Sequence, residues 1–205
     1  MRAALVAAVA ALVVLAPWTI RNIHVFHRPV LIATEGGETL RGANCPPAYH
    51  GRNIGSWQSG CVHFSGTGNE AKELDQLGHH GVSYAAHHAT RVPLVLAARL
   101  SRTWGLWPFF QVPEGRRAWV MHVGAVLFFL LLPFAVLGFL ELRRRRAPTW
   151  VILTPVVMVT ISTLLSYGSL RFRHLAEISL VVLAGAGLDA VRKRREGTAS
   201  TAGPT

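Results

Sequence analysis

The chain has 205 residues, of which 51% are hydrophobic and only 15% are charged. A soluble domain usually carries about 25% charged residues. The apolar residues are concentrated in a few long runs and the charges lie between them. This pattern excludes a disordered chain, a coiled coil and an ordinary soluble domain, and it indicates an integral membrane protein.

The net charge of +11 comes from 21 Lys and Arg residues against 10 Asp and Glu residues. The largest basic clusters, residues 143–146 and 192–195, lie directly beside apolar runs. Basic residues at such places set the orientation of a membrane protein, so the charge needs no nucleic acid to explain it. We therefore expect the lipid bilayer as a partner and no nucleic acid.

Four apolar segments predict an all-α membrane protein with four transmembrane helices. They are residues 1–20, 119–142, 150–167 and 175–191. A transmembrane helix needs roughly 17–25 residues, and these segments are close to that length. The first segment has an alternative interpretation as a cleaved signal peptide, whereas Trp18 near its end is typical of an anchor at the membrane interface.

The positive-inside rule places both basic clusters in the cytoplasm. The prediction is then a multi-pass plasma-membrane protein with both termini in the cytoplasm. Residues 21–118 form one extracytoplasmic loop domain that contains short helices, and residues 168–174 form a short outer connection. Residues 192–205 are expected to be a basic, disordered tail in the cytoplasm.

Three patterns organise the predicted loop domain. Residues 30–33 are apolar and indicate a short strand. Residues 69–101 indicate a helix that begins with acidic side chains and that Gly78 and Gly81 are expected to break. An apolar stripe near the end of this helix predicts that it lies on the membrane surface, and its members are Leu94, Leu96, Ala97 and Leu100.

The loop domain also contains both cysteines and two pairs of histidines. An oxidising outer compartment permits a disulfide between Cys45 and Cys61, and two unpaired thiols are the alternative. The histidines at 79–80 and 87–88 suggest a metal site, but they are further apart than the i, i+4 pair of zinc-binding helices, and no carboxylate completes a ligand set. A solvated helix at the membrane interface explains them, and no metal is expected.

Arginines at the outer side of the membrane are the candidate binding residues. Arg171 and Arg173 lie in the predicted outer connection, where the positive-inside rule disfavours arginine. Planar guanidinium groups match phosphate oxygens, so both are candidates for holding a lipid phosphate, and Arg21 after the first span is a further one. The alternatives are snorkelling to the headgroups and, for Arg173, an ion pair with Glu177.

The order of several motifs resembles the C-terminal part of polytopic membrane glycosyltransferases. The motifs are APWTIRN at the end of the first span, LIATEGGETLRGANCP, GANCPPAYHGRNIGSWQSGC, SYAAHH, ARLSRTWGLW, and Arg-Phe-Arg before LAEISLVVLAGAGLDA. Together they extend over residues 16–191. The family they resemble is glycosyltransferase family 39 with its relatives of the GT-C class, the protein mannosyltransferase-like and aminoarabinose-transferase-like enzymes, especially the actinobacterial members.

This resemblance implies an enzyme that takes its sugar from a polyprenyl-phosphate carrier and transfers it on the outer face. It implies positions near the carrier phosphate for Arg171 and Arg173, and also for Arg21. The family places its catalytic carboxylate in the first outer loop of a much longer chain, and no residue here matches it, so no catalytic residue is assigned. The expected activity then needs a separate N-terminal catalytic part. The alternatives are a truncated product, a non-catalytic remnant, or a non-enzymatic four-span protein that acts as a binding or assembly subunit.

Overall fold

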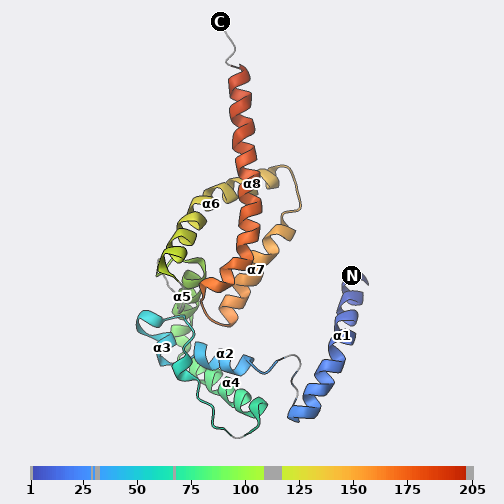
Figure 1. Cartoon of the computed structure of the whole chain (residues 1–205), viewed down its shortest axis with the longest axis vertical. Coiled ribbons are helices and arrows are strands. Elements are labelled where there is room, and N and C mark those ends of the chain that lie inside the picture. The colour runs from blue at the N-terminus through green and yellow to red at the C-terminus, as the bar shows by residue number, and fades with distance from the viewer. Residues whose placement is uncertain (1, 29, 31–32, 67, 109–116, 202–205) are drawn as a thin grey trace. The chain divides into compact units, whose positions relative to one another are not determined.

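A computed structural model describes residues 2–28, 30, 33–66, 68–108 and 117–201 (Figure 1). The chain divides into two compact units, residues 1–95 and 96–205. The first unit contains α1 (Arg2–Phe26), α2 (Gly36–Ala43), α3 (Pro46–Tyr49) and α4 (Glu70–His87). Helix α5 (Val92–Trp104) begins in the first unit and ends in the second, which also contains α6 (Ala118–Arg144), α7 (Trp150–Leu165) and α8 (Leu170–Thr201). The described residues contain no strand, so the predicted all-α class is confirmed over them.

Three helices of the described chain are long and apolar enough to cross a membrane. They are Leu5–Phe26 within α1, Ala118–Arg144, which is α6, and Leu170–Arg194 within α8. Their apolar side chains face outward to a large extent, since only 6% of the apolar window of α1 and 17% of that of α6 are buried. Lipid is the solvent that makes such exposure favourable, because apolar surface is unfavourable in water.

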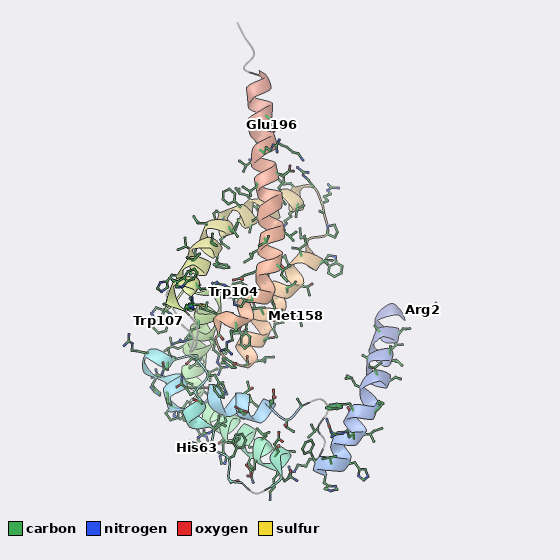
Figure 2. The ribbon with its side chains drawn as sticks, in the orientation of Figure 1. Arg2, His63, Trp104, Trp107, Met158 and Glu196 are labelled. Carbon is green, nitrogen blue, oxygen red and sulfur yellow. A yellow bond between two sulfur atoms is a disulfide. The ribbon has the colours of Figure 1, made fainter. Side chains whose placement is uncertain are left out.

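Helix α7 is shorter than the other candidates. Its 16 residues extend about 24 Å at 1.5 Å per residue, whereas the hydrocarbon core of a bilayer is about 30 Å thick. Apolar side chains nevertheless project outward along it, and Met158 is 60% exposed (Figure 2). The predicted fourth span, residues 150–167, therefore stays a prediction.

Two predicted boundaries differ from the helices. Helix α1 continues to Phe26, six residues beyond the predicted span, so Arg21 lies on the helix and not in the loop domain. Helix α8 begins at Leu170, which shortens the predicted outer connection of residues 168–174 and places Arg171 and Arg173 on the helix. Extending an existing helix by a few residues costs little, so a helix can continue past the end of its apolar run.

The predicted disordered tail, residues 192–205, is corrected for the same reason, because α8 continues to Thr201. Two ion pairs at i, i+4 spacing support this extension. Lys193 Nζ contacts Asp189 Oδ2 at 2.7 Å, and Arg192 Nε contacts Glu196 Oε1 at 2.8 Å. Each pair at this spacing stabilises a helix by about 0.2–0.5 kcal/mol.

The two glycines expected to break a helix instead lie within the continuous helix α4. A Cβ atom on Gly81 would lie 2.5 Å from the carbonyl oxygen of Leu40 in α2, and one on Gly37 would lie 1.6 Å from the carbonyl oxygen of Leu74. A Cβ atom on Gly78 would likewise lie 3.2 Å from the Cα of Gly37. These glycines are therefore required for the backbones of α2 and α4 to touch, and they do not end the helix.

Helix α4 begins and ends at other signals. The side chain of Asn69 accepts a hydrogen bond from the backbone N–H of Lys72 at 3.0 Å, and acidic residues fill the first turn, as predicted. The helix ends before a 3₁₀ turn at Ala89–Arg91, which leads to Pro93 in α5. Pro93 is the second residue of α5, where the missing backbone N–H costs the helix no hydrogen bond.

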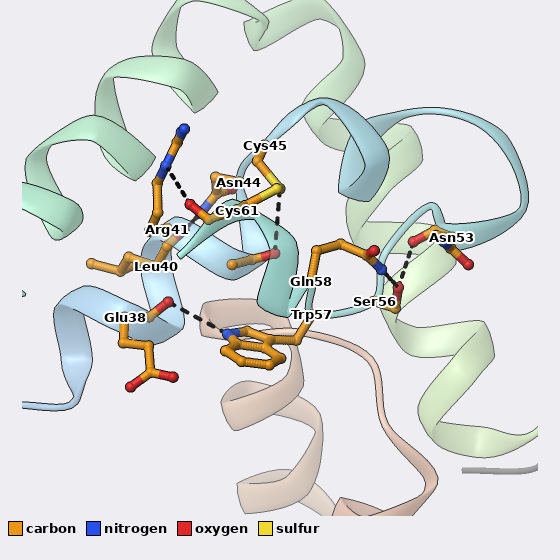
Figure 3. The surroundings of a disulfide bond; sticks show 11 residues. Glu38, Leu40, Arg41, Asn44, Cys45, Asn53, Ser56, Trp57, Gln58 and Cys61 are labelled. Atoms are coloured by element: carbon orange, nitrogen blue, oxygen red, sulfur yellow. Dashed lines mark hydrogen bonds between the residues drawn. A yellow bond between two sulfur atoms is a disulfide. The ribbon is translucent and has the colours of Figure 1, made fainter. Parts of the chain in front are cut away.

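The predicted disulfide between Cys45 and Cys61 is present (Figure 3). It belongs to the core of the first unit, where Cys45 packs with Ala48, Tyr49 and Val95. The chain-entropy account of disulfides gives about 3 kcal/mol for closing a loop of this length. The bond therefore contributes to the stability of a small core.

Hydrogen bonds attach the disulfide loop to α2. Arg41 Nε donates to the carbonyl oxygen of Cys61 at 3.2 Å, and Trp57 Nε1 donates to that of Glu38 at 3.4 Å (Figure 3). Trp57 also lies against Gly42, where a Cβ atom would be 2.1 Å from its indole nitrogen.

The predicted strand at residues 30–33 includes Leu31 and Ile32, which lie outside the described residues.

The predicted apolar stripe of α5 is not its buried face. Leu94 is 56% exposed, and Ala97 is exposed as well. The residues of α5 that are buried are Val95, Ala98, Arg99, Arg102 and Thr103. Two arginines thus lie on the buried side, because tertiary packing and not the hydrophobic pattern decides which face of this helix is covered.

Candidate anion-binding site

The site lies in the second unit, where the end of α5 packs on the connection between α7 and α8. Thr103 joins the two segments, because its hydroxyl oxygen accepts hydrogen bonds from the Thr163 hydroxyl and from the backbone N–H of Ser169, both at 3.1 Å. Thr103 and Thr163 are fully buried. The bond to Ser169 satisfies a backbone donor just before α8 begins at Leu170.

Close backbone contact fixes the same junction. A Cβ atom on Gly168 would lie 2.5 Å from the carbonyl oxygen of Arg99 and 2.8 Å from the Cβ of Arg102. Arg99 Nη1 also donates to the carbonyl oxygen of Leu164 at 3.0 Å. Glycine is therefore needed at 168, and the start of α8 is held in one position relative to α5.

Arg173 is the central residue of the site and is only 4% exposed. Its Nε donates to Glu177 Oε1 at 2.9 Å, and its guanidinium carbon lies 4.0 Å from the ring centre of Phe128 in α6. The predicted ion pair with Glu177 is thus confirmed. The group also lies close to Gly105, where a Cβ atom would be 2.9 Å from Nη1 of Arg173.

Nη1 of Arg173 is buried and has no hydrogen-bond partner among the described residues. A buried donor without a partner costs roughly 1–3 kcal/mol, and more when the group is charged. Such a group calls for a specific explanation in a native protein. An anion accepting a hydrogen bond from Nη1 would remove the cost.

The acidic partner of Arg173 is limited to one shared carboxylate. Glu177 is the one acidic group that the described structure gives in ionic contact with Arg173, and Arg99 and Arg102 of the same unit are also buried. Glu177 is also shared, because its Oε2 lies 2.9 Å from Nδ1 of His174. Burial lowers the pKa of Arg102, whose guanidinium lies 5.6 Å from the ring centre of Trp107 (Figure 2). Buried cations are stable only with compensating charge, so this arrangement is suited to an anion.

The structure places the three predicted arginines in different surroundings. Arg173 is buried, whereas Arg171 is exposed. The step of two residues from one to the other turns the side chain by about 200° around the helix axis. Arg21 belongs to the first unit, where its guanidinium lies 5.3 Å from the ring centre of Trp18 and Nη1 donates to Oδ1 of Asn22 at 3.4 Å. Arg171 and Arg173 therefore do not point to one ligand from the same side of α8.

Sequence reasoning missed Arg99 and Arg102. They are three residues apart on α5, so they lie on one face of the helix, and this spacing was the available signal. A search for arginines three residues apart in a mainly apolar helix before a predicted span would have found both residues.

The histidines and carboxylates of the predicted loop domain make other contacts. His88 stacks on Tyr84 with 4.1 Å between the ring centres, and its Nδ1 lies 2.9 Å from the carbonyl oxygen of Tyr84. Glu70 accepts a hydrogen bond from Thr34 at 2.8 Å, and Asp75 pairs with Arg28 at 2.7 Å. Glu114 lies outside the described residues. No group of three potential metal ligands occurs in the part of the chain that the structure describes.

No family model, no curated protein and no solved structure matches this chain.

Proposed function

We propose that the chain is the C-terminal membrane part of a glycosyltransferase that uses a polyprenyl-phosphate-linked sugar and transfers it on the outer face. The observation that supports this proposal is the buried guanidinium of Arg173 with its unpartnered Nη1. In the proposal Arg173 contacts the phosphate of the carrier, Arg99 and Arg102 add positive charge, and Arg171 and Arg21 contact headgroups or carrier at the membrane surface.

The proposal leaves activation of the acceptor to another part. Transfer of this kind needs a carboxylate that removes the proton of the acceptor. Glu70 and Asp75 already form side-chain contacts with Thr34 and Arg28, and we assign no catalytic role to any described carboxylate. A separate N-terminal catalytic part would supply it.

The direct test is binding of a labelled polyprenyl phosphate to the purified chain in phosphatidylcholine nanodiscs. We expect saturable binding that unlabelled polyprenyl phosphate displaces and that uncharged polyprenol of the same length does not, because the site recognises the phosphate. No sugar transfer is expected from the chain alone. Equal displacement by polyprenol would contradict the phosphate site, and turnover by the isolated chain would contradict the need for a catalytic partner.

The proposal also requires four spans, with α7 crossing the membrane and both termini in the cytoplasm. Basic residues 143–146 lie at the C-terminal end of α6, which favours a cytoplasmic position for that end. Alkaline phosphatase fused after Gly68 should be active, and the same enzyme fused after Arg146 should be inactive, at matched levels of fusion protein. The opposite pattern of activity would reverse the orientation and remove the basis for an outer-face enzyme.

A second candidate is a non-enzymatic binding or assembly subunit. The observation in its favour is a groove of about 700 Å³ in the first unit, between α2 and α4. Its lining includes Leu40, Leu74 and Val82 together with the Arg28–Asp75 ion pair. Absence of phosphate-dependent carrier binding in the nanodisc assay would favour this candidate.

A further inference from the structure

A small cavity separates α6 from α8 near the end of α6, within the second unit. Its volume is about 140 Å³. Apolar residues line most of it, together with one arginine from each helix and one glutamate; the residues are Leu137, Leu140, Gly187, Ala190 and Val191 with Arg144, Arg194 and Glu141. We propose that this cavity binds an anionic phospholipid of the surrounding bilayer, with the headgroup phosphate between Arg144 and Arg194.

The order of the lining residues along both helices matches the order of groups in a phospholipid. On α6, Leu137, Leu140 and Arg144 are spaced three and four residues apart, so they lie on one face. On α8, Gly187, Val191 and Arg194 repeat the same spacing in reverse order. Each arginine is thus seven residues, about 10 Å, beyond the deepest lining residue. The phosphate would lie at the arginines and an acyl chain beside the apolar residues.

Exposure of the lining residues agrees with contact to lipid. Leu137 is 42% exposed and Leu140 is 47% exposed, although both line the cavity. Both belong to α6, which is one of the helices apolar enough to cross a membrane. Two of the lining residues are therefore also accessible from outside the helix pair, where the proposal places the acyl chain.

The charges around the cavity favour an anion. Glu141 is the acidic residue in the lining, and its carboxylate already contacts Arg145 at 2.9 Å and Arg194 at 3.8 Å. Arg144 forms no salt bridge with any described residue, so its charge is available to a ligand. The flanking basic residues, 143–146 and 192–195, add an attraction to anionic lipids of about 1 kcal/mol for each residue near the membrane surface.

The pair Arg144→Gln and Arg194→Gln tests the site in the full chain, purified in a neutral detergent. The probe is a fluorescent short-chain phosphatidylglycerol, and its binding is followed by anisotropy at about 0.5 M salt, where the Debye length is about 4 Å. We expect the affinity to fall about thirtyfold or more, since two direct charge-assisted contacts are lost, and salt screens such contacts much less than it screens surface charge. The matched control is Arg143→Gln with Arg192→Gln, which removes the same charge from residues of the same helices that do not line the cavity. It should stay within about threefold of the parent, because surface charge is screened at this salt concentration. Equal losses in the two double variants would overturn the proposal.

Competition on the unmodified chain gives a second test that does not depend on the folding of a variant. Unlabelled phosphatidylglycerol should displace the probe, whereas phosphatidylcholine with the same acyl chains and free glycerophosphate should displace it poorly. Equal displacement by phosphatidylcholine would show that charge is not recognised, and equal displacement by glycerophosphate would show that the apolar lining is not used; either result would overturn the proposal.

Discussion

Replacing Arg173 with alanine is expected to weaken polyprenyl phosphate binding by about ten- to a hundredfold, because one charge-assisted contact contributes roughly 1.5–3 kcal/mol. The side chain is 4% exposed, and its Nη1 is one of three buried side-chain donors without a hydrogen-bond partner among the described residues, with Nε of Arg91 and Nε of Arg99. Loss of this group removes the proposed phosphate contact without removing an exposed charge. The measurement is binding of the labelled carrier in nanodiscs, with circular dichroism to monitor folding.

Three companion variants separate a binding role from a structural one. Arg173→Lys keeps the charge but loses the planar fork, so binding should be intermediate. Glu177→Gln breaks the ion pair with Arg173 but removes a competing carboxylate, so carrier binding should be unchanged or tighter. Arg117→Ala, an exposed arginine at the start of α6, is the matched control and should bind as the parent does.

The results of this series can contradict the carrier site in two ways. A folded Arg173→Ala variant that binds the carrier normally would remove Arg173 from the site. A loss in Glu177→Gln as large as that in Arg173→Ala would show that the ion pair supports the fold and that Arg173 does not bind phosphate. The lysine and glutamine variants decide the question if the alanine variant does not fold.

Replacing Gly138 with valine should strongly destabilise the packing of α6 on α8. A Cβ atom on Gly138 would lie 1.9 Å from the carbonyl oxygen of Leu183, and one on Gly187 would lie 2.1 Å from that of Phe134. Backbone atoms cannot move aside as a flexible side chain can, so the two helices must separate. Overpacking of this kind typically costs about 1–3 kcal/mol and occasionally more. Unfolding by a denaturing detergent, followed by circular dichroism, measures the change in the free energy of unfolding.

The same helices provide matched controls for this prediction. A Cβ atom on Gly124 in α6, or on Gly185 in α8, would meet nothing within 4 Å. Gly124→Val and Gly185→Val should therefore change the free energy of unfolding little, because each adds the same side chain outside the interface. Equal destabilisation by all three variants would show that valine is unfavourable in these helices generally and that the close contact is not the cause.

Local signals in the sequence were sufficient for much of the fold. The apolar run of α6 predicted residues 119–142, and the helix is Ala118–Arg144. Asn69 and the acidic residues after it predicted the start of α4. The shared polar segment of Cys45 and Cys61 predicted their disulfide. Each of these features depends on length, capping or proximity in the chain, which one sequence displays directly.

Some sequence patterns could not be interpreted without knowing which other segment of the chain packs against them. Gly78 and Gly81 resembled helix breaks, but they allow α2 to approach the backbone of α4. The apolar stripe of α5 predicted a helix at the membrane surface, which stays a prediction, but it did not reveal that Arg99 and Arg102 on the same helix are buried. A sequence shows which residues are small or apolar, but it does not show which segment lies against them.

The sequence by itself determined that the protein is helical, that long apolar helices suited to a membrane occur in it, and that arginines at unusual positions are candidate binding groups. Only the tertiary structure decided which arginine is buried, because Arg171 and Arg173 have the same chemistry and differ in the side of α8 on which they lie. Phe128, Glu177 and Gly105 surround one of them. Whether a guanidinium is buried, and whether its N–H groups have hydrogen-bond partners, depends on the residues that pack around it. Those residues are distant in the sequence.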